Sequence, residues 1–590
     1  PAENSNDAKA STKVFYLDNS FSMQSEKDGF SLLENSISGL EEFNVNIASD
    51  EEVYLMDNDF SVKDLFPYSK NAFLERLTEL DQSHSSRTFE QIFNRLDQLE
   101  AEGKKEIFII SDLQKSTYGN VEKIDIDSND IIHIVSQSPD KVSNIYIDSV
   151  WLEKPFVLAD EANELKVRMA LYGDERIENF PVKLFLNDKQ AAASNVNLNP
   201  NEFTEITFSI PNIPAQGLRG MVSVDDSPVY FDNDYYFTLK PIRSINVALI
   251  AESNNQFFDA LFKTEAFFNY SFIPSGNPDL SKIKKSDFVI VDKMEVLPDF
   301  INSSLLDFLK NGGHVLISHP SAVGLDKLLS VFGMRISILE NSPGNMSLKK
   351  PDLNNPLFQS VFENIEDNTD MPFGKRNISI GNYDQANLYF EDSKPFLVEK
   401  NLSEGKLHVF TGDLDVQNSN LYRHALFVPL MYKLVTGSIS KNSSALAYNF
   451  DQYYIEYSIP GEVNPESVLK IKKKDLEIIP EQYSSNSGIV ISIPKEELKP
   501  GYYEMYFNDT LMGEIALNVN RNESILDFYN EKELLKLFPN SDNINFEQSG
   551  DIESFAEAYH QTHYGQELWK YFLICSLIFL LFEILLIRFL

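Results

Sequence analysis

Asp18, Ser20 and Ser22 stand at alternate positions directly after a short apolar run, residues 14–17. The run is typical of a buried strand, and a helical pattern over about 29–43 follows the polar residues. One carboxylate and two hydroxyls in a strand-end loop can direct three oxygens at one point, and hard divalent cations bind such oxygens. The alternative is a polar turn in which Asp and Ser cap the helix.

Two further segments carry residues of the same kind. A second apolar run, residues 107–110, ends close to Asp112, and Thr88 begins a segment whose apolar residues recur at helical spacing. A hydroxyl at a helix N-terminus can cap the helix or coordinate an ion. We predict a site for Mg²⁺, or another divalent cation such as Ca²⁺ or Mn²⁺, with ligands on three strand-end loops: Asp18, Ser20, Ser22, Thr88 and Asp112.

This set resembles the metal-ion-dependent adhesion site of von Willebrand factor type A domains. The match lies in Asp18-x-Ser20-x-Ser22-Met23, and Thr88 and Asp112 fit the usual second and third loops. Many of these domains have glycine after the last aspartate, where this chain has leucine. The resemblance implies that a partner's Asp or Glu fills an open position on the ion, which is adhesion rather than catalysis. The alternative is a fold that is kept with an empty ion site.

The composition excludes some partners. The 590 residues suggest several domains, and 51 Lys and Arg against 89 Asp and Glu give a net charge of -38. This charge argues against nucleic acid, whose phosphates need basic residues, and disfavours adhesion to an anionic lipid surface. The single cysteine, Cys575, leaves no intrachain disulfide.

The end of the chain predicts a membrane span. Residues 571–590 are almost continuously apolar, which is about the 20 residues that a helix needs to cross a bilayer. Trp569 and Tyr571 suit the interface at its start, and Arg588 can reach the interface at its far end. Glu583 lies inside the span, where an ionisable group is either functional and paired or close enough to the exit to reach the headgroups.

The pattern between these ends changes three times. Strands alternate with helices in the first part, and strands alone recur in the second. The same two patterns then follow once more, so we expect a multidomain fold of α/β and β units. The expected order is as follows: linker 1–12; von Willebrand type A-like domain 13–142; immunoglobulin-like β-sandwich 143–242; α/β domain 243–440; small β-sandwich 441–520; juxtamembrane neck 521–568; transmembrane helix 569–590.

The second α/β domain resembles the class I glutamine-amidotransferase-like fold. The nucleophile of that family is a cysteine at a strand-to-helix turn, and this chain has no cysteine before position 575. A serine replacement would need Gly-x-Ser-x-Gly, which is absent from the sequence. We therefore expect an inert domain, with His319 and Asp292 near strand ends in structural roles.

The whole order resembles the BatA-type proteins of the bacterial aerotolerance cluster. The likeness rests on three segments: 16–23, 110–114 and 565–570. Members of that family usually carry a pair of membrane helices ahead of the first domain, which are missing from this sequence. The resemblance implies an inner-membrane location and soluble domains in the periplasm. It also implies partners: other membrane proteins, among them related von Willebrand type A proteins, and a MoxR-type AAA+ ATPase.

The sequence thus favours a membrane-anchored, non-enzymatic scaffold that binds protein partners through a divalent cation. One alternative is a hydrolase that uses the 243–440 domain. The other is a purely structural subunit whose ion site is vestigial.

Overall fold

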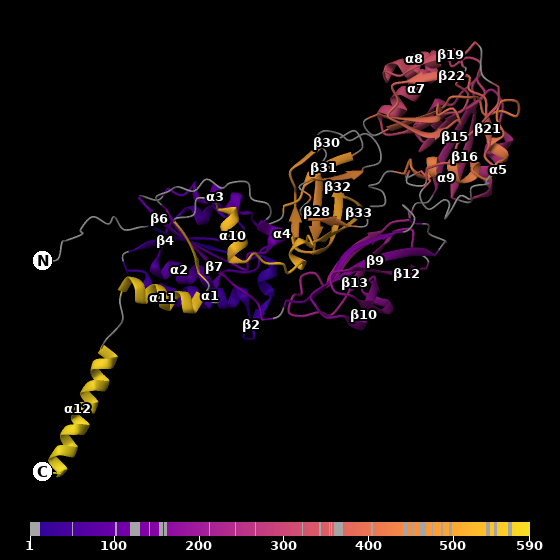
Figure 1. The fold of residues 1–590 in the computed structure, drawn as a ribbon. Helices are drawn as coiled ribbons and strands as arrows, with labels where there is room; N and C mark the ends of the chain where they lie inside the picture. Colours follow the sequence, from indigo (N-terminus) through magenta and orange to yellow (C-terminus); the bar gives the residue numbers. More distant parts are fainter. Residues whose placement is uncertain are drawn as a thin grey trace.

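The chain folds into mixed α/β units and β-rich units, which follow one another along an elongated molecule (Figure 1). The computed structural model describes residues 12–589 except 50, 101–102, 119–129, 141, 153–156, 158–161, 212, 242–243, 266, 321, 341–343, 353–354, 356, 359–369, 403–404, 440–446, 451, 453, 459–467, 475, 485–487, 495–497, 539–542, 548–551 and 565–568.

The first unit is built on a six-stranded sheet in the order β34-β7-β6-β1-β4-β5. All neighbours are parallel except β4 and β5. The apolar runs in β1 and β6 are buried, as expected for a parallel sheet that is covered on both faces. The strands are β1 Thr12–Leu17, β4 Glu52–Met56, β5 Tyr68–Ser69, β6 Lys105–Ser111, β7 Ile131–Ser136 and β34 Ile544–Glu547.

Helices cover both faces of this sheet. Phe15 and Phe108 pack with α1, α2 and α11 on one face, and Val14 and Tyr16 pack with α3 and α10 on the other. A short hairpin, β2 and β3, precedes α1. The bounds are α1 Leu32–Phe43, α2 Lys70–Thr78, α3 Phe89–Leu96, α4 Lys115–Tyr118, α10 Glu531–Leu537, α11 Ile552–Tyr564, β2 Glu26–Lys27 and β3 Phe30–Ser31, with short 3-10 turns η1 Phe21–Gln24, η2 Asn44–Asn46 and η3 Val62–Leu65.

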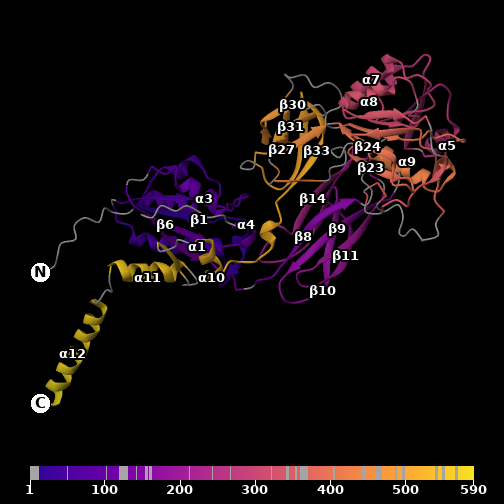
Figure 2. The same cartoon turned by 45° about the horizontal axis from the view of Figure 1, so that its top comes forward.

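The segment expected to be a juxtamembrane neck, 521–568, contributes instead to the first unit. β34 pairs in parallel with β7, from Ile544 opposite Ile132 onward, and extends the sheet. α11 lies against α1 in both views (Figure 1 and Figure 2), and Tyr559 donates a hydrogen bond of 2.9 Å to Glu106 on β6. The first unit is therefore discontinuous in sequence, and the domains between 143 and 520 are an insertion into it.

Two β-rich units lie in the insertion. The first has a four-stranded sheet, β11-β10-β13-β14, over a three-stranded sheet, β12-β9-β8, with one shared core. The second has the sheets β26-β33-β32-β28-β29 and β27-β31-β30. The strands are β8 Asn144–Leu152, β9 Asn163–Tyr172, β10 Ile177–Leu186, β11 Lys189–Leu198, β12 Phe203–Ile210, β13 Leu218–Ser223, β14 Asp234–Leu239, β26 Tyr448–Asn449, β27 Tyr454–Ser458, β28 Leu469–Lys473, β29 Leu476–Ile478, β30 Gln482–Ser484, β31 Gly488–Ser492, β32 Gly501–Phe507 and β33 Thr510–Asn518.

These two β units are joined by polar contacts. Arg219 binds both carboxylate oxygens of Glu514, at 2.8 and 2.5 Å. The Asn518 side chain exchanges two hydrogen bonds of 2.8 Å with the Tyr236 backbone. Bidentate pairs of this kind fix orientation as well as distance.

A second α/β unit lies between the two β units in sequence. Its seven-stranded sheet runs β16-β15-β17-β18-β25-β24-β23, parallel from β16 to β25, with α5 and α9 on one face and α6, α7 and α8 on the other. The bounds are β15 Ile245–Ala251, β16 Phe268–Pro274, β17 Phe288–Val291, β18 His314–Ile317, β23 Gln385–Tyr389, β24 Pro395–Leu402, β25 Gly405–Phe410, α5 Gln256–Thr264, α6 Leu280–Lys284, α7 Asp299–Lys310, α8 Leu325–Val331 and α9 Phe427–Thr436; small pairs are β19 Arg335–Ile338 with β22 Ile378–Gly381 and β20 Met346–Ser347 with β21 Phe373–Gly374, and η4 is Leu421–Arg423.

The last helix, α12, spans Trp569–Phe589 and projects away from the other elements (Figure 1). Its described side chains, 572–584, are all exposed, Glu583 among them. Among the residues whose placement is described, no helix combines the length and apolar character that a membrane crossing needs. The side chains of Trp569, Tyr571 and Arg588 lie outside the described residues, so the predicted span stays a prediction.

Phe555 tests whether α11 belongs to the first unit. It is 3% exposed, and its ring lies 6.1 Å from Phe43 and 6.0 Å from Phe108. We expect Phe555→Ala to destabilise this unit by about 3–5 kcal/mol, the usual cost of emptying a buried phenylalanine site. Faster hydrogen exchange in β1 and β6 would report this destabilisation. Glu557→Ala, an exposed position on the same helix, is the control, and equal exchange in both variants would contradict the assignment.

Two buried histidines make the second α/β unit sensitive to acid. Burial lowers the pKa of His314 and of His408 to about 3, and the rings lie 6.0 Å apart. The unfolded chain binds these protons near pH 6.5, so stability is complete above that pH and falls as the pH drops toward 3. The slope is about 1.4 kcal/mol per pH unit for each histidine.

We therefore expect His408→Gln to reduce the loss of stability in acid by about half, because unfolding then takes up one proton instead of two. Hydrogen exchange in β15 and β18 at pH 7 and pH 4.5 measures the effect. His424→Gln, at a half-buried ring outside this pair, should leave the loss of stability in acid unchanged. An unchanged acid slope in His408→Gln would show that other groups cause it.

Candidate cation site and a second polar cluster

Asp18 is the hub of a buried hydrogen-bond network at the carboxyl end of β1. Its Oδ1 accepts bonds from the Ser20 backbone N–H, at 3.0 Å, and from the Asn58 amide, at 2.7 Å. Its Oδ2 accepts bonds from the hydroxyls of Ser111, at 2.7 Å, and Tyr118, at 2.9 Å. These donors come from the ends of β1, β4 and β6 and from α4, so one carboxylate ties four segments together.

The two loop serines lie side by side beneath the surface. Ser20 and Ser22 are each 1% exposed, and their hydroxyl oxygens are 3.2 Å apart. The 3-10 turn η1 begins at Phe21 and keeps this spacing. The structure thus brings together the Asp-x-Ser-x-Ser part of the predicted site.

Asp112, directly after β6, has a free carboxylate. It is 1% exposed, and neither of its oxygens has a hydrogen-bond partner of ordinary geometry in the described part of the chain. Burial raises its pKa well above the usual range, the charge of Asp18 adds to the rise, and the nearby Ser22 hydroxyl opposes it. A buried carboxyl without donors is costly unless something compensates it.

Thr88 caps a helix and is not linked to this group by hydrogen bonds in the described residues. Its hydroxyl accepts the Gln91 backbone N–H at 3.3 Å, and the Thr88 backbone N–H donates to the Gln91 side-chain oxygen, which makes a capping box at the start of α3. Thr88 is exposed, and none of its hydrogen bonds within the described residues reaches Asp18 or Asp112. Of the two roles that the sequence allowed, the structure shows the cap.

Glu523 enters the site from the far end of the chain. Its Oε2 accepts the Ser22 backbone N–H at 3.1 Å, and the residue is 7% exposed in the turn η6, Asn522–Ser524. Burial raises the pKa of Glu523 to about 7, and the charge of Asp18 adds to the rise. The sequence alone did not predict Glu523, because 501 positions separate it from Ser22 and no local motif marks it.

Three other members were also missed. Asn58, Ser111 and Tyr118 hold Asp18, and Asn58 also bonds Asn19 at 3.0 Å. The sequence pattern could have predicted Asn58. This residue follows the buried apolar run of β4, just as Asp18 follows the buried apolar run of β1. Polar residues at the carboxyl ends of neighbouring parallel strands gather at one edge of a sheet.

The oxygen set suits a hard divalent cation. Asp18 already accepts four hydrogen bonds, as many as a carboxylate has lone-pair sites, so it orients the loop and supplies charge. The hydroxyls of Ser20 and Ser22 and the free carboxylate of Asp112 are the groups left to bind an ion. No three Asp, Glu, His or Cys side chains in the described residues form a metal site by themselves, and here two of the donors are serines.

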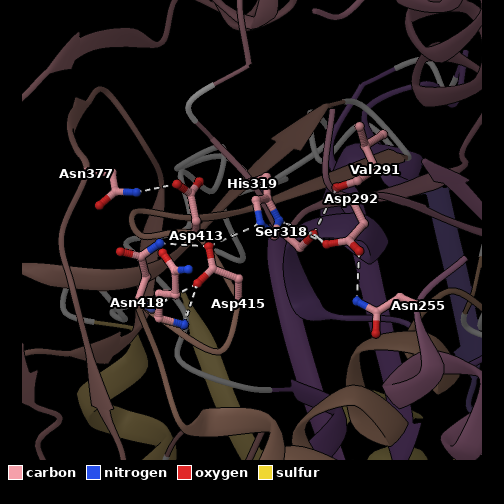
Figure 3. A network of polar contacts seen from close by, with 10 residues as sticks. Asn255, Val291, Asp292, Ser318, His319, Asn377, Asp413, Asp415 and Asn418 are labelled. Carbon is pink, nitrogen blue, oxygen red and sulfur yellow. Dashed lines mark hydrogen bonds and ion pairs between the residues drawn. The ribbon is translucent and has the colours of Figure 1, made fainter. Parts of the chain in front are cut away.

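A second polar cluster lies at the carboxyl ends of β17 and β18 (Figure 3). The Asp292 carboxylate accepts the Ser318 hydroxyl at 2.5 Å and the Asn255 amide at 2.8 Å. His319 lies between two acids, with Nδ1 2.9 Å from Asp292 and Nε2 3.8 Å from Asp415. Burial opposes ionisation of Asp292, but His319 and the two donors hold its pKa below the usual range.

This cluster differs from a nucleophile with its base. A catalytic serine donates to a basic nitrogen, which takes its proton. Ser318 donates instead to Asp292, and the His319 Nδ1, 3.5 Å from the Ser318 oxygen, faces the same carboxylate. The contacts join the ends of β17 and β18 to the loop after β25.

The free carboxylate of Asp112 has a measurable consequence. At a pH high enough to ionise Asp112, and without divalent ions, we expect Asp112→Asn to stabilise the first unit by about 2 kcal/mol, because the neutral amide avoids the cost of an uncompensated buried carboxylate. With excess Mg²⁺ the wild type should become more stable than Asp112→Asn, because only the wild type gains free energy from binding the ion. Thermal unfolding in EDTA and in Mg²⁺ measures both, with exposed Asp299→Asn as control. An equal change in both buffers would contradict the prediction.

Comparisons with known proteins do not place the chain in a family. No family model and no curated protein matches it. Similar solved structures include a cytoplasmic protein from Salmonella typhimurium (13% identity, 33% of this chain and 98% of that chain, TM-score 0.26). Others are a CARDB domain from Pyrococcus furiosus in complex with di-metal ions (16%, 18% and 97%, 0.16) and a ThuA-like protein from Bacteroides uniformis (10%, 34% and 94%, 0.25). At these TM-scores they assign neither fold family nor function.

Proposed function

We propose that the chain is a membrane-anchored scaffold that binds protein partners through a divalent cation in its first unit. The ion is Mg²⁺ or a similar divalent cation. The binding residues are Ser20, Ser22 and Asp112, with Asp18 as the organiser of the loop. Thr88 is left out of this set because it caps α3.

The observation that carries the proposal is the free carboxylate of Asp112. Neither of its oxygens has a hydrogen-bond partner of ordinary geometry in the described residues, although the Ser22 hydroxyl and the Gln114 backbone lie near, and the hub carboxylate of Asp18 is close as well. Polar groups inside a folded protein are normally paired, so an orphaned carboxylate at a cluster of oxygens favours a missing cation. A cation held by oxygens with an open position can bind a partner's carboxylate.

The fold supports the resemblance to von Willebrand type A domains. The first sheet is mainly parallel and has helices on both faces, and Asp18 and Asp112 follow neighbouring strands, β1 and β6. Loops at the carboxyl ends of such strands are where open α/β sheets bind ligands.

The exposed apolar side chains of α12 support a membrane anchor. Phe572 is 71% exposed and Phe579 74%, and neighbouring leucines and isoleucines are exposed as well. So much apolar surface on one helix favours burial in lipid or protein. The BatA-type resemblance adds the bacterial inner membrane, with the soluble domains in the periplasm, and related von Willebrand type A proteins and a MoxR-type ATPase as partners.

A hydrolase of the second α/β unit is the competing function. The cluster of Ser318, His319 and Asp292 is the observation in its favour, because these residue types can form a nucleophile, a base and an orienting acid. The Ser318 hydroxyl is engaged by Asp292, which argues for a structural role. Turnover of an ester or amide that is lost in Ser318→Ala would favour this reading.

The test is capture of partners by the full-length protein in mild detergent, with mass spectrometry of what is bound. We expect EDTA and Asp112→Asn each to reduce capture at least about tenfold, and added Mg²⁺ to restore it in the wild type only, because the ion bridges the two proteins. Asp299→Asn should bind as the wild type does. Capture that ignores both EDTA and Asp112→Asn would favour the structural subunit with a vestigial site.

A further inference from the structure

The connection that returns from the inserted domains reaches the cation site through the side chain of Glu523. Glu523 lies in η6, between β33 of the second β unit and α10 of the first unit, and accepts the Ser22 N–H at 3.1 Å. The nearby Ser86 hydroxyl opposes the rise in the pKa of Glu523. A carboxylate from outside the first sheet thus lies where the serine loop turns.

Buried acids gather at this point without a basic partner in the described residues. Asp18, Asp112 and Glu523 are all buried carboxyls that influence one another. In the described part of the chain, no Lys or Arg forms a hydrogen bond or ion pair with any of the three. Buried acids without a positive partner are costly to ionise, and a divalent cation would offset that cost.

We propose that Glu523 is a ligand of the cation held by Ser20, Ser22 and Asp112. The ion then joins the loop after β1 to the segment that returns from the inserted domains. This inference rests on the proposed function and deepens it: Glu523 occupies the position that a partner's carboxylate would take, so a partner binds only as Glu523 leaves.

The backbone around Glu523 is attached to both sides of this junction. On the first unit, the Gln114 amide donates to the carbonyls of Glu523 and Ile525, each at 2.8 Å. On the first β unit, Asn144 donates to the Ser524 carbonyl at 3.1 Å. The position of Glu523 therefore depends on how the two units sit against each other.

Arg521 strengthens the second attachment. Its buried guanidinium donates to three backbone carbonyls of the first β unit: Ile147 at 3.0 Å, Phe231 at 3.3 Å and Asp234 at 2.6 Å. Two residues further along the chain is Glu523. A shift of the inserted domains would move Arg521 and withdraw Glu523 from the ion, so the fold couples domain position to access to the site.

The experiment measures Mn²⁺ binding to the full-length protein in detergent by electron paramagnetic resonance. Glu523→Gln keeps an oxygen for the Ser22 N–H but removes the charge. We expect it to weaken Mn²⁺ binding about tenfold or more, as loss of a charged ligand does. In the wild type, Mn²⁺ or Mg²⁺ should slow hydrogen exchange over 521–529, and in Glu523→Gln it should not.

Controls separate this inference from the proposed function. Glu557→Gln, an exposed acid on α11, should bind Mn²⁺ as the wild type does. Thermal unfolding in EDTA checks that each variant is folded, and Glu523→Asp, which is one methylene shorter, replaces Glu523→Gln if that variant does not fold. Equal Mn²⁺ binding in wild type and Glu523 variants, with unchanged exchange over 521–529, overturns the role of Glu523 but leaves the cation site. No Mn²⁺ binding by the wild type, or binding that Asp112→Asn does not weaken, overturns the cation site itself.

Discussion

The parallel pairing of β34 with β7 is the contact on which the rest of the molecule depends. It adds a strand from residues 544–547 to a sheet that otherwise comes from residues 12–136. Because the chain leaves and re-enters the same unit, the inserted domains are held at two points instead of one. The same return places η6, with Glu523, at the carboxyl end of β1.

Local patterns predicted a large part of the fold and of the candidate site. Apolar runs such as Ile107–Ile110 became buried strands, because a parallel sheet covered on both faces needs continuous apolar sequence. The alternate spacing of Asp18, Ser20 and Ser22 brought their polar groups together, and Asp112 lies with them because neighbouring strands end at one edge.

The features that the sequence could not predict depend on long-range contacts, or on a local pattern that fits two roles equally well. Thr88 has the right position for a cap and for a ligand, and only the surrounding structure decides between them. Glu523 and β34 look like ordinary polar sequence, because the residues that they meet lie more than 400 positions earlier. Periodicity describes one segment at a time, so it assigned 521–568 to a neck.

The split first unit also sets an order of events during synthesis. When β7 has left the ribosome, its outer edge has no partner, and the apolar face that α11 will cover is open. About 400 residues separate β7 from β34, which takes roughly 20–80 s at ordinary rates of elongation. The inserted domains are complete before the first unit can close, so we expect an unfinished sheet edge to need protection from other nascent chains during that interval.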